Sequence, residues 1–117
     1  MVIGHKDDIT PIVHSDGVNV IGAGIKKAIG QEEGWEDYVL RFVELAPNGK
    51  SFDHIHPWPH INYYIKGQGI LTLEGREYPV SEGMYTYVPQ DMQHQWKNTS
   101  GDNKLEFICI VPKEGHK

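Results

Sequence analysis

Residues 54–60 read His-Ile-His-Pro-Trp-Pro-His, a stretch that places three histidines close together. Side chains two residues apart on a strand point to the same face, so His54 and His56 can be aimed at one point. The two prolines of this stretch lack the N–H that a central strand needs, so the chain must turn there. His60 then opens the next strand and can be delivered to the same point. The stretch therefore predicts a strand, a turn and a second strand, arranged so that the three imidazoles converge.

Short strand-like segments flank this stretch on both sides. Turn signals recur between them, and no stretch shows sustained helical periodicity. The best helix candidate, residues 25–38, is interrupted by Gly30 and Gly34. Many short strands with closely spaced turns predict an antiparallel sandwich or barrel, an all-β fold. The segments rich in β-branched and aromatic residues are 38–45, 60–66, 69–73, 84–89, 94–98 and 104–112.

The length of 117 residues suits one domain. Residues 36–112 hold the predicted strands and are expected to form the barrel core. Residues 1–35 are expected to add edge strands or a partner-facing arm to the same domain. Residues 113–117 are expected to be a C-terminal tail.

Composition excludes several classes of partner. The formal net charge is −5, with acids and bases interspersed, so a nucleic acid would be repelled. No apolar run approaches the ~20 residues of a membrane span, and the start has no secretory signal pattern. Cys109 is the only cysteine, so no internal disulfide can form, which fits a cytoplasmic location.

The histidines allow two interpretations. Any one of them, taken alone, is expected at the surface or in a single hydrogen bond. Three converging imidazoles would repel one another when protonated, whereas a metal cation binds their neutral forms and removes that conflict. His94 lies far along the chain, after the turn at 89–91, and only the tertiary fold can bring it to the others.

The spacing around this cluster resembles the first motif of the cupin family, G-x5-H-x-H-x3/4-E-x6-G. His54 and His56 occupy the two histidine positions, and Gly67 closes the motif. Asn48 stands at the first glycine, with Gly49 beside it. The glutamate position is taken by His60. The motif thus spans about residues 48–67.

The second cupin motif, G-x5-P-x-G-x2-H-x3-N, is matched over residues 83–98. Gly83, Pro89, His94 and Asn98 fit it, and Asp91 replaces the middle glycine. The chain resembles small single-domain cupins, and within them the bacterial manganese cupins with four-histidine sites.

The resemblance implies a double-stranded β-helix, that is, a jelly roll of two antiparallel sheets, and a homodimer. It also implies one divalent transition metal per chain held by His54, His56, His60 and His94. All-nitrogen ligation suits manganese, iron, nickel, cobalt, copper or zinc, and the resemblance to manganese cupins makes manganese the first expectation. Replacing the usual glutamate by a neutral imidazole raises the charge of the site from near +1 to +2. Such a site should favour an anionic ligand.

Strand alternation predicts the pocket around the metal. Trp96 shares the face of His94, and Asn62 and Tyr64 share the face of His60. The resemblance places Cys109 near the metal, with Phe107 on the same face. An inert core thiol is the alternative for Cys109.

Arg41 lies in an otherwise apolar segment, and two interpretations stay open for it. It can point inward with Val39 and Val43 and pair with a substrate carboxylate. It can also lie on an edge face, paired with Glu44 or with a partner subunit.

The resemblance favours a metal-dependent oxidoreductase of dioxygenase type acting on a small organic or aromatic substrate. Three alternatives stand beside it: an isomerase or lyase that uses the metal to polarise a carbonyl, a sensor that binds a small ligand without turnover, and a closed structural metal site. The missing glutamate counts against proton shuttling in the isomerase alternative. Nothing in the sequence decides whether the protein is an enzyme at all.

Overall fold

Nine strands carry most of the regular structure in a computed structural model of the chain, which describes residues 1–116. Three single-turn 3-10 helices complete it: η1 (Lys6–Asp8), η2 (Gln31–Glu33) and η3 (Lys113–Gly115). Part of the predicted tail, residue 117, lies outside the described residues. The strands are β1 (Ile12–His14), β2 (Ile21–Ile29), β3 (Tyr38–Lys50), β4 (His60–Lys66), β5 (Gln68–Leu73), β6 (Arg76–Ser81), β7 (Tyr85–Val88), β8 (His94–Asn98) and β9 (Leu105–Pro112).

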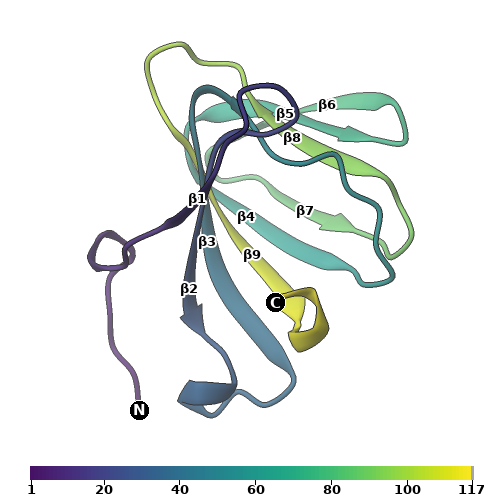
Figure 1. Cartoon of the computed structure of the whole chain (residues 1–117). Coiled ribbons are helices and arrows are strands. Elements are labelled where there is room, and N and C mark those ends of the chain that lie inside the picture. Colours follow the sequence, from purple (N-terminus) through teal and green to yellow (C-terminus); the bar gives the residue numbers. More distant parts are fainter. Residues whose placement is uncertain (117) are drawn as a thin grey trace.

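The strands form one curled antiparallel sheet in the order β6-β5-β8-β3-β9-β4-β7, with β2 paired to β3 and β1 paired to β2. The long strand β3 makes the curl possible. Its first part pairs with β9 and β2, and its last residue, Lys50, reaches Lys97 of β8. Figure 1 shows β5, β6 and β8 folded over from the strands β4 and β7. The predicted all-β jelly roll in a single domain is confirmed.

The core lies inside this curl and follows from strand alternation. Along β9 every second side chain is buried, beginning with Leu105 and ending with Val111. Val39 and Val43 of β3 and Tyr64 of β4 meet them from neighbouring strands. Burying each large apolar side chain contributes about 1.5–3 kcal/mol, so the period-two pattern of these strands fixes which face turns inward.

Three local features add to what the sequence indicates. Residues 25–38, the best helix candidate, form no α-helix: β2 runs through Ile29, and only the single turn η2 follows. Residues 47–49 read Pro-Asn-Gly, a composition typical of turns, yet they lie inside β3, where Asn48 adopts φ +60° and the pairing with β2 shifts. Strand β6 went unpredicted because its residues are exposed apart from Val80, so it lacks an alternating pattern.

The N-terminal region lies along the edge of the sheet. β1 pairs only with β2 among the strands of residues 1–116. Lys6 of η1 reaches the carboxylate of Glu106 on β9 at 2.9 Å, and the Lys26 ammonium donates to the carbonyl of Lys6 at 3.0 Å. These contacts fasten the arm to the sheet. Among the described residues, no helix has the length and apolar character that crossing a membrane requires.

Candidate metal centre

The centre is built where a loop meets the start of two strands. Residues 51–59 are largely irregular, and His54 forms an isolated bridge with His94, the first residue of β8. The His54 N–H donates to the His94 carbonyl at 2.9 Å, and the His94 N–H donates back at 2.8 Å. This bridge joins residues that are distant in the chain. His60 opens β4 directly after the two prolines, as the sequence predicts.

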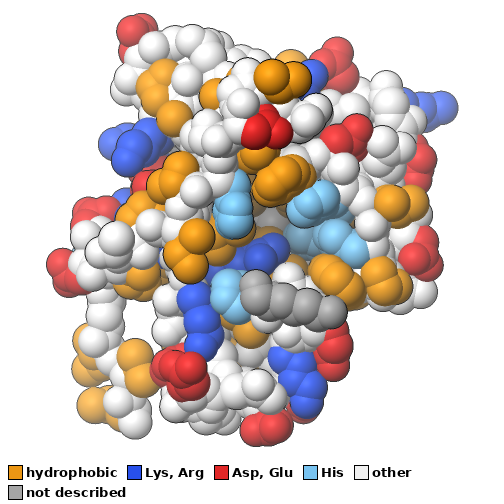
Figure 2. Space-filling model, viewed as in Figure 1, with side chains coloured by type: hydrophobic (Ala, Val, Ile, Leu, Met, Phe, Trp, Pro, Cys, Tyr) orange, Lys and Arg blue, Asp and Glu red, His pale blue; other side chains and the backbone are white. Residues whose placement is uncertain are grey.

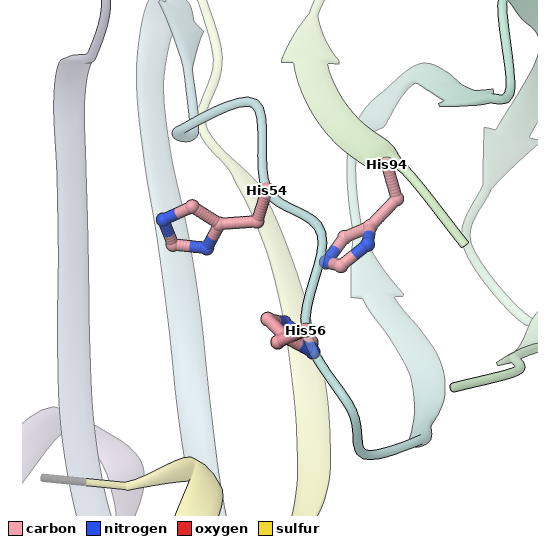
Figure 3. A group of neighbouring side chains, drawn as sticks. All are labelled: His54, His56 and His94. Atoms are coloured by element: carbon pink, nitrogen blue, oxygen red, sulfur yellow. The ribbon is translucent and has the colours of Figure 1, made fainter. Parts of the chain in front are cut away.

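Three histidines form a cluster there, and His60 lies beside two of them. The ring nitrogens that His54, His56 and His94 can offer all lie within 4.8 Å of one another. Their side chains extend from the loop and from the start of β8 (Figure 3). His60 joins the group through His56, with their Nε2 atoms 2.9 Å apart. The ring centroids of His60 and His94 are 4.8 Å apart.

The outer nitrogens of three of these rings are anchored. His56 Nδ1 donates to the carbonyl of Trp58 at 3.2 Å, and His94 Nδ1 donates to the carbonyl of Met92 at 2.9 Å. Because a carbonyl only accepts, each Nδ1 carries the proton and leaves the Nε2 lone pair free for a metal. His60 Nδ1 lies 3.2 Å from the Cys109 sulfur, so Cys109 holds that ring in place.

Electrostatics keep the cluster neutral. Burial lowers the pKa of His60 to about 2, helped by the neighbouring His94 and His56 and by the Arg41 charge. Burial is also the main reason why the pKa values of His54, His56 and His94 are lowered. A metal ion binds neutral imidazole, so these ligands need not lose a proton at neutral pH. The donor set therefore fits a divalent transition metal.

The cluster forms one wall of a small cavity of about 70 Å³. His54, His60 and His94 line it, and most of the remaining wall is apolar. Figure 2 shows histidine side chains gathered around a hollow on this face, with basic side chains beside them. No carboxylate of residues 1–116 lines the cavity.

The sequence-predicted pocket residues divide into two groups. Arg41, Trp96, Phe107 and Cys109 line the cavity. The remaining two, Asn62 and Tyr64, are fully buried and are not among its lining residues.

These two belong to a buried hydrogen-bond network. The Trp96 indole donates to the Tyr64 hydroxyl at 2.8 Å, which lies 2.9 Å from the Thr86 hydroxyl. The Thr86 hydroxyl donates to the side-chain amide oxygen, Oδ1, of Asn62 at 3.1 Å. The network holds Trp96 in the cavity wall. Alternation places both residues on the inner face, but their polar groups are engaged within the wall.

Arg41 points inward. Its Nη2 lies 3.6 Å from the Cys109 sulfur, and the flanking Val39 and Val43 are buried. Glu44, its alternative partner, instead pairs with Lys26 at 3.3 Å and Lys104 at 3.5 Å. Burial raises the pKa of the Cys109 thiol.

Sequence reasoning missed other cavity residues, including His14, Ser51 and Phe52. The Phe52 ring stacks on the His54 ring with 5.2 Å between the ring centroids. The His14 and Phe52 rings pack edge to face, with their centroids 5.8 Å apart. Phe52 could have been found, because it precedes His54 by two residues and the same alternation applies. His14 comes from β1, and no local pattern links it to the cluster.

Comparisons with known proteins give a consistent picture. Residues 41–111 match the family model described as "Cupin domain". A dimethylsulfoniopropionate lyase, DddW of Ruegeria pomeroyi, is 31% identical over 78 residues, which are 67% of this chain and 50% of that protein. The chain therefore spans about half the length of this curated relative.

Two solved structures share the fold. The polyketide cyclase RemF from Streptomyces resistomycificus superposes with a TM-score of 0.84 at 25% identity, covering 96% of this chain and 79% of that one. A predicted oxalate decarboxylase from Thermotoga maritima gives a TM-score of 0.82 at 20% identity, covering 95% and 98% of the two chains. The second likeness shows the fold alone.

Proposed function

The chain belongs to the cupin domain family, and from this premise we propose that it is a metal-dependent lyase acting on a small organic molecule. The observation that carries the proposal is the neutral histidine cluster, which opens on a cavity that has a cationic guanidinium and no carboxylate from the described residues. Such a site attracts an anionic or strongly polar ligand toward the metal-binding nitrogens.

His56, His60 and His94 would hold the metal through Nε2, with His54 as the fourth ligand. Manganese is the first expectation, and iron, nickel, cobalt, copper or zinc also suit four nitrogens. When bound, the ion supplies Lewis acidity that polarises a carbonyl or carboxylate oxygen. The chain supplies the orientation: the carbonyls of Trp58 and Met92 fix two rings, and Cys109 fixes His60.

The names of two relatives support a lyase over the dioxygenase that the motif resemblance favours. The relative at 31% identity is named as a lyase, and the structure at 25% identity is named as a cyclase. Lyase and cyclase reactions need no external oxidant. The dioxygenase reaction and the non-catalytic sensor remain the alternatives.

The test measures product and oxygen together. The protein is loaded with manganese or zinc and offered small carboxylic acids with a leaving group at the β-carbon, together with phenols and diketones. A lyase should release an unsaturated product with either ion and consume no oxygen. Oxygen uptake confined to the manganese form would contradict the lyase proposal and support the dioxygenase. Tight binding without any product would support the sensor instead. His56→Ala serves as the control for metal dependence.

We also propose that the protein is a homodimer, formed through the outer face of β3, β9, β4 and β7. Tyr85 and Tyr87 are 81% and 60% exposed there, and a monomer rarely exposes a wide apolar patch. Two cross-strand rows of this face contain no charged residue although the chain carries −5, so two copies can approach through them with little repulsion. Glu44 and Glu106 come next to these rows on the same face. The two rows are Leu40, Ile110, Ile61, Tyr87 and Phe42, Ile108, Tyr63, Tyr85.

Sedimentation tests the dimer. The wild-type protein should sediment at twice its mass of 13.3 kDa, and Tyr85→Lys should shift it to the monomer. Tyr78→Lys, on β6 and 45% exposed, is the matched control and should stay dimeric. A wild-type monomer, or a Tyr85→Lys dimer, contradicts the proposal.

A further inference from the structure

Arg41 has no counter-charge among the described residues. Its Nε is buried and has no hydrogen-bond partner. None of the ion pairs formed by residues 1–116 includes Arg41. Within residues 1–116 its side chain makes one hydrogen bond, from Nη2 to the Cys109 sulfur at 3.6 Å. A guanidinium has five N–H donors, and a thiol sulfur is a weak acceptor, so most of its hydrogen-bonding capacity is unused.

Arg41 is partly buried, and its Nε fully so; an unpaired charge that loses part of its hydration costs free energy, and proteins normally pair it. Here the surroundings increase the cost. The cavity wall beside Arg41 is mostly apolar and includes Ile25, Val43 and Phe107. Arg41 lines the same cavity as His54 and His60, so its charge lies beside the histidine cluster. A metal ion would add further positive charge, so the missing negative charge must come from the ligand.

We infer that Arg41 binds the carboxylate of a short-chain acid in the cavity, with the reacting part of that acid directed to the histidine cluster. The guanidinium fork matches a carboxylate with two parallel hydrogen bonds. The cavity of about 70 Å³ is far below the ~300–1,000 Å³ of pockets for drug-sized ligands, so the acid is small. The apolar wall accommodates its hydrocarbon part.

The inference rests on the proposed function only in that the cavity is a substrate site. It narrows the substrate to carboxylates, which the lyase proposal alone does not. It also explains why an arginine stands in the apolar segment 38–45 with its charge turned inward.

The test uses the whole chain of 117 residues, freed of metal so that no ion can attract the ligand. Propionate is titrated by NMR, with propionamide as the uncharged probe of the same shape. Propionate should bind and propionamide should not. Arg41→Gln should weaken propionate binding by about tenfold to a hundredfold, the range expected for hydrogen bonds to a charged group. Lys97→Gln, which removes one exposed cation on β8, is the matched control and should leave binding unchanged.

A second measurement needs no variant. In the wild-type protein the Arg41 Nε–H resonance should shift as propionate is added. An unshifted resonance, no binding to the metal-free wild-type protein, or equal binding to Arg41→Gln overturns the inference. Metal content of Arg41→Gln, measured in parallel, should match the wild type. If Arg41-dependent binding is found while no acid is turned over by the loaded protein, the lyase proposal fails and the carboxylate site stands.

Discussion

Acidification should destabilise the metal-free protein through His60. The side chain is 3% exposed, and its folded-state pKa is about 2, well below the ordinary value of about 6.5 in an unfolded chain. Below pH 6.5 the His60 imidazole becomes protonated in the unfolded chain but stays neutral in the folded protein. Stability is therefore complete above that pH and declines as the pH falls toward the folded pKa.

The size of the effect follows from the unfolded value. Each pH unit below 6.5 removes about 1.4 kcal/mol, so at pH 5.0 His60 alone destabilises the fold by about 2 kcal/mol. This is a large part of the 5–15 kcal/mol that typically separates folded from unfolded states. His94, which is 2% exposed and has a lowered pKa, acts in the same direction.

The measurement is urea unfolding, followed by tryptophan fluorescence with a chelator present, from pH 7.5 to 5.0. The wild-type protein should lose about 2 kcal/mol or more over this range. His60→Gln should lose about 2 kcal/mol less, because glutamine does not titrate. A difference in the free energy of unfolding that stays the same at every pH reports only altered packing. If the wild-type and His60→Gln curves differ only in this way, the idea that burial holds His60 neutral is refuted.

Three further predictions concern the wall and the metal. Tyr64→Phe leaves the buried Trp96 indole without its acceptor and should cost about 1–3 kcal/mol in urea unfolding, with metal content unchanged. Gly67→Ala should cost more than Gly34→Ala by urea unfolding; both glycines have positive φ, but only at Gly67 would a Cβ collide with the Lys104 carbonyl. Adding a divalent transition metal at 100 times its dissociation constant should raise stability by about 2.7 kcal/mol in the same assay, and chelator should reverse the gain.

The sequence predicts the regular strands well where one face is buried. β4 matches its predicted range, and β9 differs by one residue, because alternating apolar residues coincide with the inner face of the sheet. β2 fails this test. Its residues Gly22, Gly24, Lys26 and Lys27 break the alternation. The buried Lys26 pairs through its ammonium with Glu44 of the neighbouring strand β3 and also donates to the Lys6 carbonyl. That pairing is tertiary and leaves no local pattern.

The candidate site divides in the same way. The close spacing of His54, His56 and His60 is a local signal, and the structure brings all three together. His94 is recognisable through its motif, although the backbone bridge that positions it forms only in the folded sheet. His14 reaches the cavity from a strand at the far end of the sheet order, so no spacing in the sequence could reveal it.

The central claim is that the histidine cluster holds one metal ion, and elemental analysis tests it most directly. The protein should be purified without a histidine tag and without added metal, and then compared with four single variants. About one divalent transition-metal ion per wild-type chain is expected, with sharply lower content in each variant, while circular dichroism shows the β-fold retained. The variants are His54→Ala, His56→Ala, His60→Ala and His94→Ala. Full metal content in all four, or none in the wild-type protein after incubation with each candidate ion, would contradict the account.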